Sequence, residues 1–187
     1  MSPFVHPHGL CESDQVGDGT RVWAFAHVLD GAIVGSDCNL CDCVFVENGA
    51  VVGNNVTVKN NVAIWDKVTI EDDVFLGPSM VFTNDFVPRA TVHRSRDELR
   101  PTLVRQGASI GANATIVCGV TIGNHALVAA GAVVVRDIAA HALVVGNPSR
   151  RVGWVCACGG RLGDELTCPE CGTGHALIDE IAGLDAL

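Results

Sequence analysis

Residues 40–76 read LCDCVFVENGAVVGNNVTVKNNVAIWDKVTIEDDVFL, and an aliphatic side chain returns at every sixth position of this stretch. A small or β-branched residue usually stands four positions after each of these. The same rhythm extends toward the amino terminus and resumes near residue 104 after an interruption. The recurring positions are Leu10, Val16, Val22, Val28, Val34, Leu40, Val46, Val52, Val58, Ile64, Ile70, Leu76 and Phe82, followed by Val104, Ile110, Ile116, Ile122, Val128 and Val134.

A period of six fits neither the 3.6-residue turn of an α-helix nor the two-residue alternation of a long strand. It fits short strands joined by tight corners, with one repeat on each flat side of a coil. Three sides of six residues close a coil of about eighteen, and each coil stacks on the next. We therefore expect an all-β fold, a parallel β-helix whose recurring aliphatic side chains are buried. Each of them contributes roughly 1.5–3 kcal/mol when buried.

Stacking also predicts ladders of side chains, because residues about eighteen apart come to lie one strand spacing, ~4.8 Å, from each other. One corner is then lined with carboxylates and amides. Two interpretations stay open, because corners also favour Asp and Asn for their tolerance of a left-handed backbone. The residues of this ladder are Glu12, Asp30, Asn48, Asp66 and Asn84.

The repeat is interrupted between Phe82 and Val104, and we expect a long inserted loop over residues 85–103. A long loop on a regular scaffold usually carries function or is disordered. The local excess of positive charge suits a phosphate, although a solvated basic loop is an equally good interpretation. The basic residues here are Arg89, Arg94, Arg96, Arg100 and Arg105.

Three segments carry a family resemblance. The first is LGPSMVFTND at residues 76–85, with Pro88-Arg89 inside the loop and Arg100-Pro101-Thr102 closing it. The others are VWAFAHV at 22–28 and GASIGANATIVCG at 107–119. Together they closely resemble the hexapeptide-repeat acyltransferases that acetylate the 3-amino group of UDP- or dTDP-linked 3-amino-3-deoxy sugars. The resemblance covers residues 10 to about 150 and implies that the β-helix is left-handed.

The resemblance implies a homotrimer whose active sites lie in the clefts between neighbouring chains. The acetyl group is supplied by acetyl-CoA, and the amine of the nucleotide-linked sugar attacks the thioester directly. Positioning then accounts for most of the catalysis. Asn84 matches the Asn of the family's Phe-Thr-Asn motif and is expected to orient the amine or to donate to the developing oxyanion. Asp66, Asp85 and Arg89 are the candidates for substrate binding.

Four residues are candidates for coenzyme A binding. Arg105 is a candidate for a phosphate, and Arg150 ends the segment VVGNPSR, which resembles the part of these β-helices near the adenosine phosphates. Ala112 and Ala130 are the other two candidates, because the resemblance implies that the pantetheine arm lies along the β-helix.

Histidine is the usual general base, so each histidine is considered as a catalytic candidate. His93 lies in the loop, His125 at a corner, and His141 after the last regular repeat. None falls in a motif that matches a catalytic histidine of other hexapeptide acyltransferases. We therefore interpret them as corner or surface residues.

The composition changes after residue 150, which divides the chain into a β-helix domain at 1–150 and a small appendage at 151–187. Two tight cysteine pairs suit tetrahedral zinc in a structural, ribbon-like site. The first pair is one residue shorter than the usual Cys-x-x-Cys, so a vestigial knuckle with free thiols is the alternative. Residues 176–187 carry apolar residues at helical spacing and predict one short helix. The four candidate zinc ligands are Cys156, Cys158, Cys168 and Cys171.

Composition excludes several classes of function. A net charge of −9 argues against nucleic acid or an anionic membrane as a partner. No apolar run approaches the roughly 20 residues of a membrane span, and the start of the chain lacks a signal peptide, so we expect a cytoplasmic protein. The alternatives are a hexapeptide acyltransferase for another acceptor, a γ-class carbonic anhydrase with three zinc-binding histidines, and a purely structural β-helix.

Overall fold

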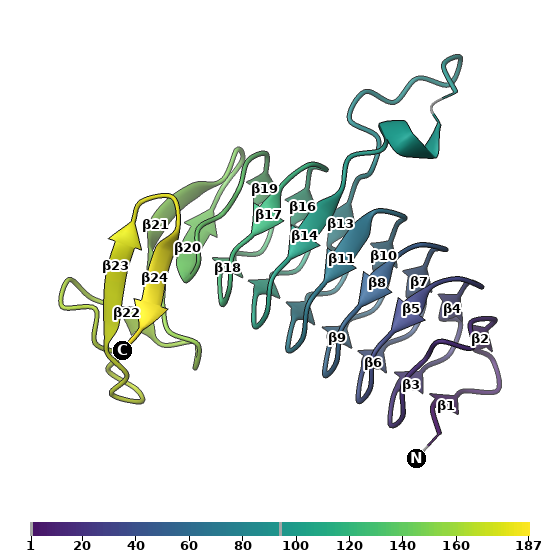
Figure 1. The fold of residues 1–187 in the computed structure, drawn as a ribbon, viewed down its shortest axis with the longest axis horizontal. Coiled ribbons are helices and arrows are strands. Elements are labelled where there is room, and N and C mark those ends of the chain that lie inside the picture. The colour runs from purple at the N-terminus through teal and green to yellow at the C-terminus, as the bar shows by residue number, and fades with distance from the viewer. Residues whose placement is uncertain (1, 94) are drawn as a thin grey trace.

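The structure is a computed structural model that describes residues 2–93 and 95–187, and it is a parallel β-helix followed by a small β-rich appendage (Figure 1). Short strands wind around three flat faces, as the period of six predicted. Strands of one face pair in parallel with the strands of the coils before and after. These features agree with the left-handed coil that the resemblance implied, and the all-β fold is confirmed.

From β3 to β19 the strands fall on three faces in rotation, and isolated bridges at Val16 and Ile138 stand in for third-face strands in the first and last coils. The first face holds β1 (Phe4–Val5), β3 (Arg21–Val22), β6 (Asn39–Leu40), β9 (Thr57–Val58), β12 (Phe75–Leu76), β15 (Ser109–Ile110), β18 (Leu127–Val128) and β20 (Ala142–Val145). The second holds β2 (Leu10–Cys11), β4 (His27–Val28), β7 (Phe45–Val46) and β10 (Ala63–Ile64), then β13 (Val81–Phe82), β16 (Thr115–Ile116) and β19 (Val133–Val134). The third holds β5 (Ile33–Val34), β8 (Val51–Val52), β11 (Val68–Ile70), β14 (Thr102–Val104) and β17 (Thr121–Ile122).

The recurring aliphatic residues form one continuous core along the axis of the β-helix. Ile64, Ile110 and Ile122 are fully buried, as are nearly all of their counterparts. The first positions depart from this expectation, since Leu10 is 50% exposed and Val16 is only partly buried. The reason is that the first coil is covered by a neighbouring coil on one side only.

The corners adopt left-handed backbone, which explains their Asn and Asp residues. Asp37, Asn55 and Asp73 all have φ near +60°, at the same corner of successive coils. Their side chains also meet, because Nδ2 of Asn55 donates to Oδ1 of Asp73 at 2.8 Å. Side chains one coil apart therefore form ladders, as predicted.

The inserted loop leaves the β-helix between β13 and β14 and projects away from it (Figure 1). The coil resumes beyond the loop, where Phe82 lies beside Ile116 of the next coil, although the pairing of the second face is interrupted between β10 and β13. Thr102 and Leu103 already belong to β14, so the loop ends earlier than the expected boundary at 103. It contains one short 3₁₀ helix, η1 (Arg96–Glu98).

The end of the β-helix is closed by antiparallel strands. β21 (Arg150–Val155) turns back along β20, and β22 (Arg161–Leu162) pairs with β21. Within residues 2–93 and 95–187, no helix is long and apolar enough to cross a bilayer.

The predicted helix at 176–187 is wrong. These residues form a hairpin of β23 (His175–Asp179) and β24 (Gly183–Ala186), in which Leu177 pairs with Leu184. Oδ1 of Asp179 accepts the backbone amides of Ile181 and Ala182, both at 2.7 Å, and so builds the turn. Ile181, which a helix needs on its apolar face, is 88% exposed. Local turn chemistry thus overrides the helical spacing of the apolar residues.

Candidate functional site

The inserted loop is closed at its base by two contacts. The backbone amide of Arg100 donates to the carbonyl oxygen of Asn84 at 3.1 Å. The guanidinium of Arg100 also lies over the ring of Phe86, 3.8 Å from its centroid. A cation over an aromatic face is attracted by the quadrupole of the ring. The loop is therefore a closed arm that begins at Asn84, at the corner between the second and third faces.

The strand before Asn84 is held by side chains from the coils on either side. Nε1 of Trp65 donates to the carbonyl oxygen of Phe82 at 2.9 Å. The hydroxyl of Thr83 accepts the backbone amide of Cys118 at 3.0 Å. Because residues 82 and 83 are tied to both neighbouring coils, the backbone that leads into Asn84 is rigid. A positioned amide at such a place suits an orienting or oxyanion-stabilising role.

The two other candidates in the loop lie within a few residues of Asn84. Oδ1 of Asp85 accepts the backbone amide of Val87 at 2.9 Å, which shapes the first turn of the loop. Arg89 is exposed, and its guanidinium donates to the carbonyl oxygen of Pro88 at 3.0 Å. Arg94, part of the predicted basic cluster, lies outside the described residues.

The predicted ladder of carboxylates and amides is present at the same corner. Nδ2 of Asn48 donates to the carbonyl oxygen of Asp30 at 2.8 Å, and the backbone amide of Asp66 donates to Oε2 of Glu47 at 2.8 Å. The side chain of Asp66 is buried beneath the loop. Both of its carboxylate oxygens accept hydrogen bonds from Arg96.

This pairing sets the charge state of Asp66. Hydrogen bonds from the Arg96 guanidinium hold the pKa of the Asp66 carboxyl below its usual value. The carboxylate is therefore ionised at neutral pH and engaged by the loop. The pairing was not predicted, although the acidic corner and the arginine-rich loop that leaves it are complementary in charge. The role of Asp66 toward a sugar stays a prediction.

The candidates for coenzyme A binding lie at other edges of the β-helix. Ala112 and Ala130 stack at the corner between the first and second faces, where the backbone amide of Gly131 donates to the carbonyl oxygen of Ala112 at 2.8 Å. Arg105 is exposed at the third corner, between β14 and β15. A single chain therefore does not bring these residues together with Asn84.

Arg150 lies at the end of the β-helix, beside a cavity of about 250 Å³. Ser149 also lines this cavity, but its hydroxyl is shielded from solvent and has no hydrogen-bond partner among the described residues. Arg136 and Arg151 line the cavity as well, and Arg151 is paired with Glu180. Asp137 and Glu180 line the cavity too, so its three guanidinium groups, which are the donors that suit a phosphate, are partly balanced by two carboxylates.

His125 and His141 both lie at corners with left-handed backbone, as expected, but His141 is buried and His125 is only partly exposed. The rings of His125 and His141 lie 5.0 Å apart, and His175 of β23 packs at 5.0 Å on the other side of His141. His141 is only 4% exposed, its Nδ1 lies 2.8 Å from the carbonyl oxygen of Val155, and burial lowers its pKa. The last coil is shorter than eighteen residues, which is why the regular spacing missed this stack. His93 is exposed in the loop, as expected.

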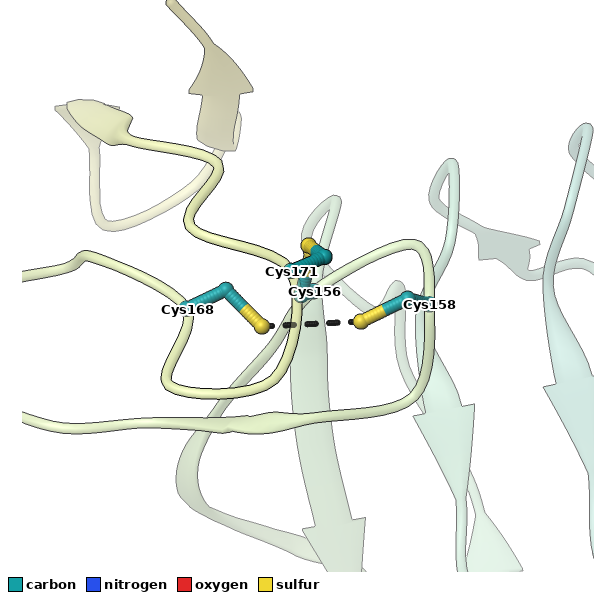
Figure 2. Close-up of side chains that lie close together, drawn as sticks. All are labelled: Cys156, Cys158, Cys168 and Cys171. Carbon is teal, nitrogen blue, oxygen red and sulfur yellow. Dashed lines mark hydrogen bonds between the residues drawn. The ribbon is translucent and has the colours of Figure 1, made fainter.

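The four cysteines of the appendage gather at one point, from two separate turns of the chain (Figure 2). Their sulfur atoms all lie within 4.8 Å of one another. Sγ of Cys156 is 3.6 Å from that of Cys171, and Sγ of Cys158 is 3.5 Å from that of Cys168. These separations fit four sulfurs placed about 2.3 Å from a tetrahedral zinc ion.

One of the four thiols has a lowered pKa, whereas the pKa values of Cys156 and Cys158 are raised. Hydrogen bonds from Thr173 lower the pKa of Cys171 to about 6. A zinc ligand must be a thiolate, so a thiol with this pKa loses its proton readily near neutral pH. The donor set therefore fits a structural metal site with no open position.

Comparisons with known proteins agree with this fold. The family model for the bacterial transferase hexapeptide (six repeats) matches residues 101–136. Over 180 residues, the chain is 49% identical to dTDP-3-amino-3,6-dideoxy-alpha-D-galactopyranose 3-N-acetyltransferase of Aneurinibacillus thermoaerophilus. That alignment covers 95% of this chain and 93% of the relative.

Two solved structures share the fold at lower identity. The acetyltransferase domain of PglB from Neisseria gonorrhoeae FA1090, in complex with acetyl coenzyme A, is 20% identical with a TM-score of 0.59, over 80% of this chain and 57% of that one. WeeI from Acinetobacter baumannii AYE is 23% identical with a TM-score of 0.58, over 71% of this chain and 59% of that one. The chain thus matches a little over half the length of these two structures.

Proposed function

We propose, because this chain belongs to the hexapeptide-repeat family of nucleotide-sugar 3-N-acetyltransferases, that it transfers an acetyl group from acetyl-CoA to the 3-amino group of a UDP- or dTDP-linked amino sugar. The observation that carries the proposal is the 49% identity to a dTDP-3-amino-sugar N-acetyltransferase over 95% of the chain. The relative's name favours a dTDP-linked 3-amino-3,6-dideoxyhexose as the acceptor.

The chemistry follows from direct attack. The unprotonated sugar amine adds to the thioester carbon of acetyl-CoA, the carbonyl oxygen gains negative charge, and the C–S bond then breaks to release the coenzyme A thiolate. The amine loses one proton during this sequence, and the thiolate can accept it. The Asn84 amide, at the end of the rigid strand β13, orients the amine or donates to the oxyanion; an amide does not act as a base. Asp85 and Arg89 bind the acceptor from the same loop.

The positions of the candidates support a site shared between chains. Asn84 begins the loop at one edge of the β-helix, whereas Ala112 and Ala130 line a different edge. Phe86 and Val92 of the loop are each 51% exposed in the single chain, which leaves apolar surface for a neighbour to cover. A homotrimer satisfies both conditions, because each loop then projects against the cofactor edge of the next chain.

The residues proposed to bind acetyl-CoA contact different parts of that molecule. Ala112 and Ala130 offer a corner of small side chains, against which the pantetheine arm of acetyl-CoA can lie close to the backbone. Arg105 and Arg150 supply positive charge for its phosphates. These residues bind and orient the thioester, which itself brings the activated acetyl group.

The appendage holds one structural zinc ion on Cys156, Cys158, Cys168 and Cys171. The close approach of the four sulfur atoms supports this assignment. Within the described residues none of the nine cysteines forms a disulfide, which suits a reducing compartment, and we place the enzyme in the cytoplasm.

An acceptor panel tests the function. Release of free coenzyme A from acetyl-CoA is followed with UDP- and dTDP-linked 3-amino sugars, matched 4-amino sugars and unmodified nucleotide sugars. We expect turnover with 3-amino acceptors only. Equal turnover with simple hydroxyl acceptors favours a hexapeptide acyltransferase of another specificity, and no turnover with any acceptor favours a structural β-helix.

A further inference from the structure

The inserted loop is fastened to the β-helix at a second point, one coil below its base. Arg96, the first residue of η1, reaches back across the corner to Asp66, and its terminal nitrogen donates to Oδ1 of Asp66 at 2.9 Å. The same guanidinium lies 3.4 Å from Oδ1 of Asn48, one coil further down. A single loop side chain thus bridges two rungs of the acidic ladder.

The corner is shaped to receive this guanidinium. Gly49 has φ of +83°, and a Cβ atom built at this residue would overlap Arg96 and the Asp66 carboxylate. A glycine is therefore required both by the backbone and by the space that Arg96 occupies. Glu47 accepts the backbone amide of Asp66 and fixes the turn that carries the carboxylate. Because the planar Arg96 guanidinium makes two hydrogen bonds to the Asp66 carboxylate, it fixes the orientation of the two groups as well as the distance between them.

We propose that Arg96 is a positioning residue for the acceptor site, and that its pairing with Asp66 holds the loop in the orientation that presents Asn84, Asp85 and Arg89. The proposal rests on the proposed function. Asn84 is the next rung of the ladder above Asp66, and the loop that Arg96 anchors begins at Asn84. Asp66 then acts through Arg96 and does not contact the sugar itself.

The position of the Arg96–Asp66 pair explains why acceptor binding should depend on this pair. The base of the loop, at Asn84 and Arg100, fixes where the loop starts but allows the arm to swing about that point. Arg96 supplies a second fixed point one coil below the base, on the rung of Asp66, so that two points and not one set the direction in which the arm leaves the β-helix (Figure 1). Ordering the loop in advance lowers the entropy that acceptor binding would otherwise lose. Loss of Arg96 should therefore weaken acceptor binding more than it slows acetyl transfer.

Steady-state kinetics of Arg96→Gln, Asp66→Asn and the double variant test the proposal. We expect the KM for the acceptor to rise about tenfold in each single variant, with kcat within about threefold of wild type. The double variant should be no worse than either single one, because both remove the same interaction. Arg96→Lys should recover only part of the loss, since an ammonium lacks the planar fork of Arg. Asp97→Asn, in the same short helix, is the matched control and should behave as wild type.

A second measurement follows the loop directly. Chymotrypsin sites at Phe86 and Leu99 are unchanged in all these variants, so the rate of cleavage in the loop reports its mobility. We expect faster cleavage in Arg96→Gln and Asp66→Asn than in wild type and Asp97→Asn.

Two results would overturn the proposal. One is an acceptor KM within twofold of wild type for Arg96→Gln. The other is a double variant whose KM is the product of the single effects, which would mean that Asp66 contacts the sugar independently. If wild type turns over no acceptor, the proposed function fails instead, and the cleavage rates still decide whether Arg96 fastens the loop.

Discussion

The carbonyl oxygen of Asn84 accepts the backbone amide of Arg100 at 3.1 Å, so the first residue of the inserted arm and its return strand are joined at one corner of the β-helix. This contact leaves the Asn84 side chain at the base of the arm, on backbone that Trp65 and Thr83 hold in place. The account of catalysis follows from that placement, because a rigidly held amide can stabilise charge without reorganising.

Replacement of Asn84 by alanine should lower kcat by roughly 10²–10³, the usual cost of losing one oxyanion donor. Trimer mass and affinity for coenzyme A should not change, because Asn84 lies at a different edge from the cofactor candidates. Pre-steady-state and steady-state assays with acetyl-CoA, together with calorimetric titration of coenzyme A, measure these quantities. An Asn84→Ala variant with full kcat would contradict the assignment.

Histidine variants provide the complementary comparison. His93→Ala, His125→Ala and His141→Ala should each retain kcat within about tenfold of wild type at pH 7.5, since loss of a general base typically costs 10²–10⁴. A single histidine variant that abolished turnover would point to base catalysis and away from positioning.

Metal analysis of protein purified without chelator should find about one zinc ion per chain. Cys168→Ser should loosen the appendage and raise its rate of hydrogen exchange, while exchange in the β-helix stays slow. Cys43→Ser, at an exposed corner of the β-helix, is the control and should retain the metal. Less than about a tenth of an equivalent in wild type would indicate a vestigial knuckle with free thiols.

Light scattering at micromolar concentration should return three times the mass of one chain. The reason is that the loop edge and the cofactor edge of a single chain lie apart and need a neighbour to meet. A monomer mass for an enzyme that is active at the same concentration would rule out the shared site.

The histidine stack makes stability depend on pH. Burial lowers the pKa of His141 and of His125, so the unfolded chain binds their protons more readily than the folded one. Their contribution is complete above the unfolded pKa of about 6.5 and is lost as the pH falls through the lowered folded values. Asp73 faces His125, and Asp185 faces His141, which moderates the effect.

We therefore expect Tm to fall between pH 7 and pH 5, and to fall less in a His141→Asn variant than in wild type. Thermal unfolding at several pH values measures both. An identical fall in the two proteins would show that other groups control the acid sensitivity.

The fold was largely predictable because each repeat places its aliphatic residue in the same environment. Ile64, Ile70 and Leu76 are all buried because each points into the axis of the β-helix, and the sequence repeats such an aliphatic residue at every sixth position. The two ends of the chain were less predictable. Leu10 is exposed because no coil precedes it, and the end of the chain forms a hairpin because Asp179 caps a turn that apolar spacing does not reveal.

The residues of the candidate site were predictable only where they belong to a short local motif. Asn84 and the four cysteines proposed as zinc ligands stand in short recognisable segments. Arg96 was missed as a partner of Asp66, because thirty residues separate them and only the folded loop brings them together. The stack of His125, His141 and His175 was missed for a similar reason, since the shortened last coil and the hairpin create it.

The most direct test of the central claim is the structure of the product. The protein is incubated with acetyl-CoA and a dTDP-linked 3-amino-3,6-dideoxyhexose, and the product is assigned by mass spectrometry and two-dimensional NMR. The account predicts one added acetyl group, as an amide on the nitrogen at C3, with one coenzyme A released for each product formed. Acetylation at a hydroxyl, or at an amine on another ring carbon in preference to C3, would contradict it.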